Sequence, residues 1–83
     1  MDIKTAARET AKRCDAHHDV SPGAWPREGT MLGYLHVRWM LAQIAKGEVA
    51  GEKAHRWLGW AQAAAVSAGA GTLEDMKQIN RQA

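Results

Sequence analysis

The chain has 83 residues, enough for one domain with a small core, and its 46% hydrophobic and 24% charged residues are typical of folded proteins and not of disordered ones. Its formal net charge of +2, spread over interspersed bases and acids, does not indicate a nucleic-acid-binding patch. The single cysteine, Cys14, excludes an internal disulfide and suits a reducing compartment, and no apolar run is long enough for a signal peptide or a membrane span. We therefore expect a single cytoplasmic domain over residues 1–83 that does not contact a membrane.

The first predicted helix covers about residues 3–17 and is followed by a loop over residues 18–26. Asp2 is a suitable N-cap, because its carboxylate can accept hydrogen bonds from the first free amides of the helix. The apolar face of this helix is narrow and mostly alanine, so we expect it to dock against a larger neighbour; so small a face also leaves room for fraying. The loop is rich in proline and glycine, and we expect Trp25 within it to fold back onto the core.

The second predicted helix covers about residues 27–46, with Gly47 as its left-handed terminator. Its apolar arc is wide, which predicts the central helix of the domain, in contact with neighbours on two sides. Gly29 and Gly33 would permit close packing near its start. The arc consists of Met31, Tyr34, Leu35, Val37, Leu41, Ala42, Ile44 and Ala45, with Trp39 and Met40 on its two flanks.

The third predicted helix, about residues 52–68, has the clearest helical periodicity in the chain. Its apolar residues recur every three or four positions, as one face of a helix with 3.6 residues per turn requires. Gly59 interrupts this segment, and we expect it to mark a place where another backbone comes close. The stripe consists of Ala54, Trp57, Leu58, Ala61, Ala65 and Ala68.

A short fourth helix over about residues 73–81 follows a glycine-containing turn, with Thr72 and Asp75 as a capping-box variant. Four helical patterns without a convincing strand pattern predict an all-α fold, a small helical bundle of three main helices plus a short C-terminal helix. The expected core residues are Leu35, Leu41, Ile44, Trp57, Leu58 and Ala61.

Arg38 lies within the apolar arc of the second predicted helix, where an unpaired charge would be costly. One interpretation is an ion pair inside the domain, with Asp15, Asp19, Glu74 or Asp75 as the candidate partners. The other is an anchor at an interface with a partner protein, where arginine is enriched.

No arrangement of residues indicates catalysis, a metal or a cofactor. The spacing of Cys14, His17 and His18 matches no zinc motif, and a nucleophile elbow and a phosphate-binding loop are both missing from the sequence. The third and fourth helices could imitate a helix-turn-helix. The second of them, however, begins Leu73-Glu74-Asp75, with two acids where phosphates and bases would lie. We therefore predict a protein that is not an enzyme, and these two acids argue against nucleic acid as its main partner.

Binding to another protein remains the best-supported class of function. Two tryptophans and a methionine lie at the margins of their helices' apolar faces, and aromatic, methionine and arginine side chains are enriched in interface hot spots. The alternative is that these tryptophans only close the edges of a small core. The candidate partner-binding residues are Arg38, Trp39, Met40, Arg56 and Trp60.

From Lys53 onward the chain resembles a group of short proteins of unknown function from tailed bacteriophages and prophages. The resemblance rests on KAHRWLGWAQ, on the small residues after it that end in glycine, and on TLEDMKQINR. It implies a phage accessory protein that acts in the cytoplasm of the bacterial host and binds a host or phage protein. It implies no activity and no site residue.

The sequence thus favours a non-catalytic phage accessory protein that modulates or inhibits a host factor by binding it. A small DNA-binding or transcription-modulating protein is the second hypothesis. A homodimer is the third, motivated by the wide apolar arc of the second predicted helix.

Overall fold

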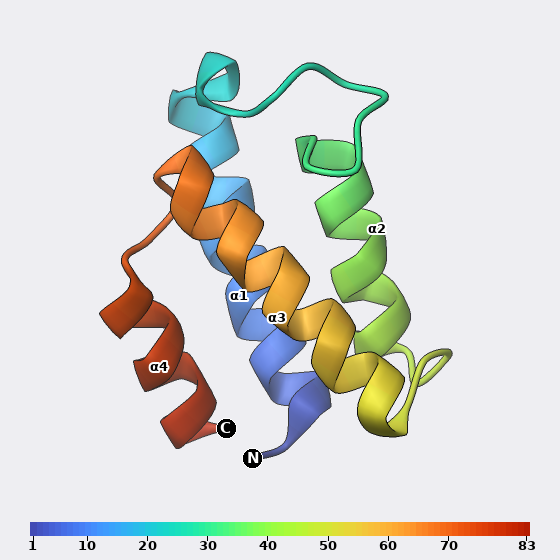
Figure 1. Ribbon diagram of the computed structural model, residues 1–83. Helices are drawn as coiled ribbons and strands as arrows, with labels where there is room; N and C mark the ends of the chain where they lie inside the picture. Colours follow the sequence, from blue (N-terminus) through green and yellow to red (C-terminus); the bar gives the residue numbers. More distant parts are fainter.

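The computed structural model describes residues 1–83 and contains four α-helices and no strand (Figure 1). The sequence-based prediction of an all-α bundle with three main helices and a short C-terminal one is confirmed. The helices are α1 (Ile3–Val20), α2 (Tyr34–Ala45), α3 (Gly51–Ala68) and α4 (Leu73–Gln82), and a short 3-10 helix, η1 (Pro22–Ala24), follows α1.

Local capping signals fix several of the helix ends. The Asp2 carboxylate accepts a hydrogen bond from the Lys4 amide, and Thr72 and Asp75 form a complete capping box at the start of α4. Gly47 and Gly69 adopt left-handed φ angles of 80° and 86°, which end α2 and α3 as glycine does at many helix C-termini.

The start of α2 differs from its prediction. The helix begins at Tyr34 rather than near residue 27, and the preceding segment is irregular. Gly29, which has a φ of 90°, interrupts any helix there, and no atom would lie within 4 Å of a Cβ at this position. Gly33 is enclosed by its own loop, including the Arg27 carbonyl. The expected close packing is therefore wrong for Gly29, whereas at Gly33 a Cβ would lie 3.3 Å from the Arg27 carbonyl oxygen, so the preceding loop does pack closely there.

The central helix is α1 and not α2, as Figure 1 shows. α1 packs against α2, α3, α4 and η1, whereas α2 packs mainly against α1 and α3. The narrow apolar face of α1 is made of small side chains that are fully or almost fully buried, which lets the neighbouring helices come close. These residues are Ala6, Ala7, Thr10, Ala11 and Cys14.

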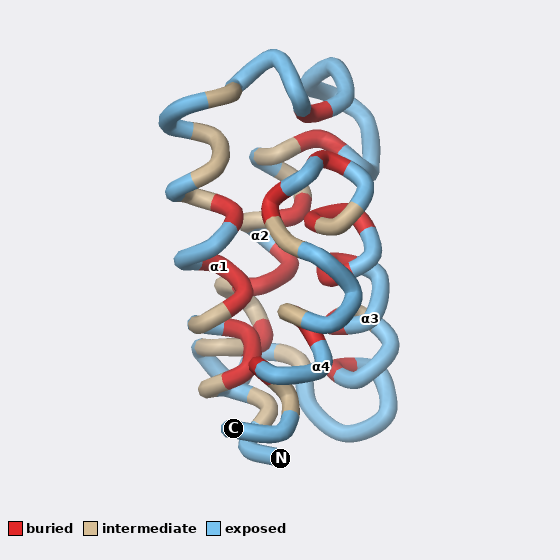
Figure 2. The backbone as a smooth tube through the Cα atoms, turned by 90° about the vertical axis from the view of Figure 1, so that its left-hand side faces the viewer, coloured by how far each residue is buried: buried red, intermediate tan, exposed pale blue.

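The core between these helices contains most of the predicted side chains. Leu41, Ile44, Leu58 and Ala61 are buried, while Trp57 is only half-buried and packs against the core from its edge. Figure 2 shows that the buried residues lie on the inner sides of the helices, between one helix and the next.

Leu35 was expected in this core, but it is 64% exposed. It lies in the first turn of α2, on the outer side of that helix. The width of the apolar arc therefore does not mean that all of the arc is buried.

Trp25 and Gly59 test two smaller predictions. Trp25 is buried in the core, as expected, although its indole N–H has no hydrogen-bond partner. Gly59 is exposed, and no atom would lie within 4 Å of a Cβ added to it, so the predicted close approach of a second backbone is wrong.

A buried polar group joins three of the helices. Gln62 of α3 donates to the Thr10 hydroxyl of α1 at 3.2 Å and exchanges two hydrogen bonds with Asn80 of α4 at 2.8 and 3.1 Å. Because buried amides are costly unless they are paired, these bonds fix how α4 sits on the other helices.

The two ends of the chain meet at one pole of the bundle (Figure 1). The Asp2 amide donates a hydrogen bond of 2.8 Å to the Ala83 carbonyl oxygen.

Candidate functional site

The five predicted partner-binding residues do not form one patch. Trp39 of α2 and Trp60 of α3 are 50% and 43% exposed, and Arg56 of α3 is also exposed. Arg38 is half-buried and faces α1. Met40 is buried, so it cannot contact a partner in this conformation; its position on the wheel places it on the side of α2 that faces the core.

Trp39 and Trp60 belong to a larger exposed apolar area, which we call the aromatic surface. It spans the loop before α2, the outer side of α2 and the adjoining side of α3. Its members are Met31, Leu35, Trp39, Trp57 and Trp60.

Direct contacts hold the aromatic surface together. The ring centroids of Trp39 in α2 and Trp57 in α3 lie 5.5 Å apart. The Trp60 indole N–H donates a hydrogen bond of 3.2 Å to the Met31 carbonyl oxygen. Met31 and Leu35 line a common surface depression. The exposed rings are thus positioned by the protein and do not depend on a partner for their arrangement.

The edge of the aromatic surface carries basic and imidazole side chains. The Lys53 ammonium lies over the Trp57 ring at 5.3 Å from its centroid, a cation–π contact, and the His36 ring lies 5.7 Å from Trp39. Arg56 is exposed one turn before Trp60 on α3. An apolar centre with a polar edge is the usual organisation of a protein–protein interface.

Sequence reasoning placed Met31 and Leu35 in the buried arc of a long second helix and so missed them as surface residues. The available signal was local: Pro26 and Gly29 precede them and argue against a regular helix there. Because no helical turn precedes them, the side chains of Met31 and Leu35 are not covered by an earlier turn of the same helix.

Arg38 takes part in a network between α1 and α2. Its Nε donates to Asp15 Oδ1 at 2.5 Å, and the Tyr34 hydroxyl donates to the same oxygen at 2.5 Å. The prediction of an internal ion pair is confirmed, with Asp15 as the partner. The His18 ring stacks on Tyr34 with 3.8 Å between centroids, and Trp25 meets Tyr34 edge-on at 5.6 Å.

The network alters two pKa values. Burial and then the hydrogen bond to Asp15 raise the pKa of Tyr34, against the opposing effect of the Arg38 charge. Burial works against the Arg38 charge, but its hydrogen bonds and attraction to Asp15 and Tyr34 together outweigh burial and raise the pKa of Arg38. Both groups are therefore held in their protonated forms, which suits a structural pair and not proton transfer near neutral pH.

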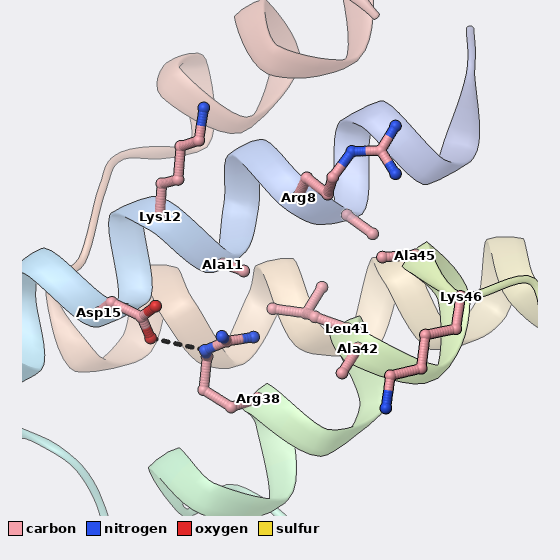
Figure 3. A pocket seen from close by; sticks show the side chains of 10 residues that line it. Arg8, Ala11, Lys12, Asp15, Arg38, Leu41, Ala42, Ala45 and Lys46 are labelled. Carbon is pink, nitrogen blue, oxygen red and sulfur yellow. Dashed lines mark hydrogen bonds and ion pairs between the residues drawn. The ribbon is translucent and has the colours of Figure 1, made fainter.

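A groove of about 310 Å³ lies beside this network, between α1 and α2 (Figure 3). Its floor consists of small and aliphatic side chains, and Arg38 closes one end. Arg8 and Lys12 come from α1 and extend away from α2, whereas Lys46 comes from α2 and extends away from α1, so these cations lie along the two outer edges of the groove (Figure 3). The floor residues are Ala7, Ala11, Leu41, Ala42 and Ala45.

Cys14 is not arranged for chemistry. It is fully buried, and burial raises the pKa of its thiol to about 12, with Asp15 adding to the shift and Arg38 opposing it. Such a thiol carries almost no thiolate near neutral pH. No group of three or more histidine, cysteine, aspartate or glutamate side chains lies close enough to hold a metal ion.

Comparison with known proteins adds no assignment: no protein family, no curated protein and no solved structure gives a significant match to the chain. Among the helices, none combines the length and the apolar character that crossing a membrane requires.

Proposed function

We propose that this chain is a small non-catalytic protein that binds another protein through the aromatic surface. The observation that carries the proposal is the exposure, side by side, of four apolar side chains from the loop before α2, from α2 and from α3: Met31, Leu35, Trp39 and Trp60 are 63%, 64%, 50% and 43% exposed. Clusters of this kind on a small protein mark interaction sites, and tryptophan is the residue most enriched in binding hot spots.

The resemblance of the C-terminal half to phage and prophage proteins supports a more specific proposal. The partner is then a host or phage protein in the bacterial cytoplasm, whose activity is changed by the binding. The DNA-binding hypothesis gains no support from the helix α4, because Glu74 and Asp75 lie in its first turn and Asp75 is used in its cap.

The test is capture of partners from nuclease-treated lysate of bacterial host cells by three tagged forms of the chain. These are the wild type, the double variant Trp39→Ala/Trp60→Ala and the control Leu73→Ala. Leu73 of α4 is as exposed as Leu35 but lies outside the aromatic surface, so its removal controls for the loss of an exposed apolar side chain. Circular dichroism establishes that all three forms are folded.

One protein captured by the wild type and by Leu73→Ala, and lost with the tryptophan double variant, is the expected result. Equal capture by all three forms would show that the aromatic surface is not the binding site. A mass in solution that rises with concentration, and does so only when both tryptophans are present, would instead assign the surface to a homodimer. Recovery of nucleic acid alone, lost after nuclease, would favour the DNA-binding hypothesis.

A further inference from the structure

The groove between α1 and α2 is a second surface, separate from the aromatic surface. It lies on the side of α2 that faces α1, whereas the contact between Trp39 and Trp57 lies on the side that faces α3. The proposed function makes no use of it.

The groove is open along two antiparallel helices. Arg38 meets Asp15 at one end, and Gly47 comes close to the Lys4 side chain at the other. Its floor presents alanines from both helices, which would allow the backbone of a third helix to approach to about 8–10 Å, the usual distance between packed helices. An added helix would cover the part of α1 and α2 that α3 and α4 leave open.

The charges around the groove are strongly unequal. Four of its ten lining residues are cationic, namely Arg8, Lys12, Arg38 and Lys46. The one acidic lining residue, Asp15, is already bound by Arg38. Lys12 is paired with Glu9, whereas the other two cations of the groove, Arg8 and Lys46, form no ion pair within the protein. A ligand of this groove therefore gains from carrying acidic groups on both sides of an apolar centre.

These observations also argue against a second copy of the chain as the ligand. α2 contains no acidic residue and α3 contains only Glu52. In α4, Glu74 and Asp75 are matched by Lys77 and Arg81, and bases outnumber acids in α1. No helix of this protein offers an acidic face.

We infer that the α1–α2 groove binds an acidic amphipathic helix of a partner protein. The apolar face of that helix lies on Ala11, Ala42 and Ala45, and its flanking glutamates or aspartates pair with Arg8 and Lys46. This is helix-in-groove recognition, in which apolar positions at helical spacing supply the contact area and the flanking charges select the partner. A nucleic acid fits less well, because its phosphates would satisfy the cations and leave the apolar floor uncovered.

The experiment selects ligands without assuming their charge. The full chain is immobilised and exposed to a displayed library of helical peptides of about 18 residues, long enough to follow the groove. All peptides share one apolar face of leucine and alanine, and their flanking positions vary among Glu, Lys, Gln and Ser. The most enriched peptide is then labelled and titrated by fluorescence anisotropy, together with a short duplex DNA.

Two double variants separate the groove from the rest of the surface. Arg8→Glu/Lys46→Glu reverses two exposed charges at the groove, and Lys53→Glu/Arg56→Glu makes the same change in net charge at the aromatic surface. We expect enriched peptides rich in glutamate and an affinity about tenfold or more weaker for the first variant only, since charges in direct contact contribute more than distant ones. Amide shifts in NMR spectra should map to Ala11, Ala42 and Ala45.

The inference is overturned if no peptide is enriched, if enriched peptides show no excess of glutamate, or if both charge-reversal variants weaken binding equally. Tighter binding of the duplex DNA, lost in Arg8→Glu/Lys46→Glu, would overturn it in favour of a phosphate-binding groove. Neither tryptophan of the capture experiment enters this test, so the two proposals can fail separately.

Discussion

His17 of α1 caps α3: its Nε2 lies 2.7 Å from the carbonyl oxygen of Ala68, the last residue of that helix. The last carbonyls of a helix have no partner within it, and Gly69 turns the chain away immediately afterwards. Because a carbonyl oxygen only accepts, Nε2 must carry the hydrogen. A side chain from the central helix thus completes the end of another helix.

His17→Ala should lower the free energy of unfolding by about 1 kcal/mol, the usual net value of one hydrogen bond to a partly buried acceptor. Urea unfolding measures this change. His55→Ala is the matched control, because His55 is an exposed residue of α3 and should tolerate the same substitution. If the two variants are equally stable, the contact with Ala68 does not stabilise the protein.

Arg38→Ala should cost about 1–2 kcal/mol, more than an exposed ion pair and less than the several kcal/mol of a fully buried one. The reason is partial exposure: the Arg38 and Asp15 side chains are 31% and 43% exposed. A double-mutant cycle with Asp15→Ala isolates the pair. Arg81→Ala, which breaks the largely exposed pair with Glu74, should have a much smaller effect, and an equal effect would contradict this account.

Gly59→Ala should stabilise the protein by about 0.5–1 kcal/mol, because alanine is the better helix former and a Cβ at this exposed position meets no atom. Gly69→Ala makes the same chemical change and should destabilise, since Gly69 has a left-handed φ of 86°. Thermal unfolding of both variants should therefore give shifts of opposite sign. A lower melting temperature for Gly59→Ala would be inconsistent with the open space around it.

Cys14 should make the protein less stable in alkali. The pKa of its thiol is raised from 9.0 to about 12 in the folded protein, so the unfolded chain loses this proton first. The thiol's contribution is fully present below pH 9.0 and is lost as the pH rises toward about 12. Unfolding free energies of wild type and Cys14→Ala, compared across this range, should converge. A constant difference would show that Cys14 does not titrate in this way.

Several helix ends could be predicted because their causes are local. Asp2, Gly47 and the pair Thr72–Asp75 each act within a few residues, and each occupies the predicted capping position. Arg38 was also recognised as needing a partner, since a charge within an apolar arc must be paired.

The arrangement of the helices in space could not be predicted in the same way. The alanines of α1 look like a weak apolar face in sequence, yet small side chains are what a central helix needs for close contact with several neighbours. Leu35, by contrast, extends an apolar pattern but has no helix beside it. Hydrophobicity records which residues could be buried, and the packing of the other helices decides which ones are.

The members of the aromatic surface could be predicted only in part. Exposure of Trp39 and Trp60 followed from their place at the margins of apolar faces, while Met31 and Leu35 depend on the late start of α2. The groove was not predictable, because it joins residues of two helices that are more than twenty positions apart.

The hydrogen bond between Asp2 and Ala83 holds the two chain ends together, so the chain could be rejoined there and cut elsewhere. A short linker from Ala83 to Met1 could close the backbone into a ring at little cost, because the ends already meet. New ends could be opened at Gly29, whose loop is exposed and lies at the opposite pole (Figure 1). Such a circular permutant would keep every helix–helix contact while moving both termini next to the aromatic surface.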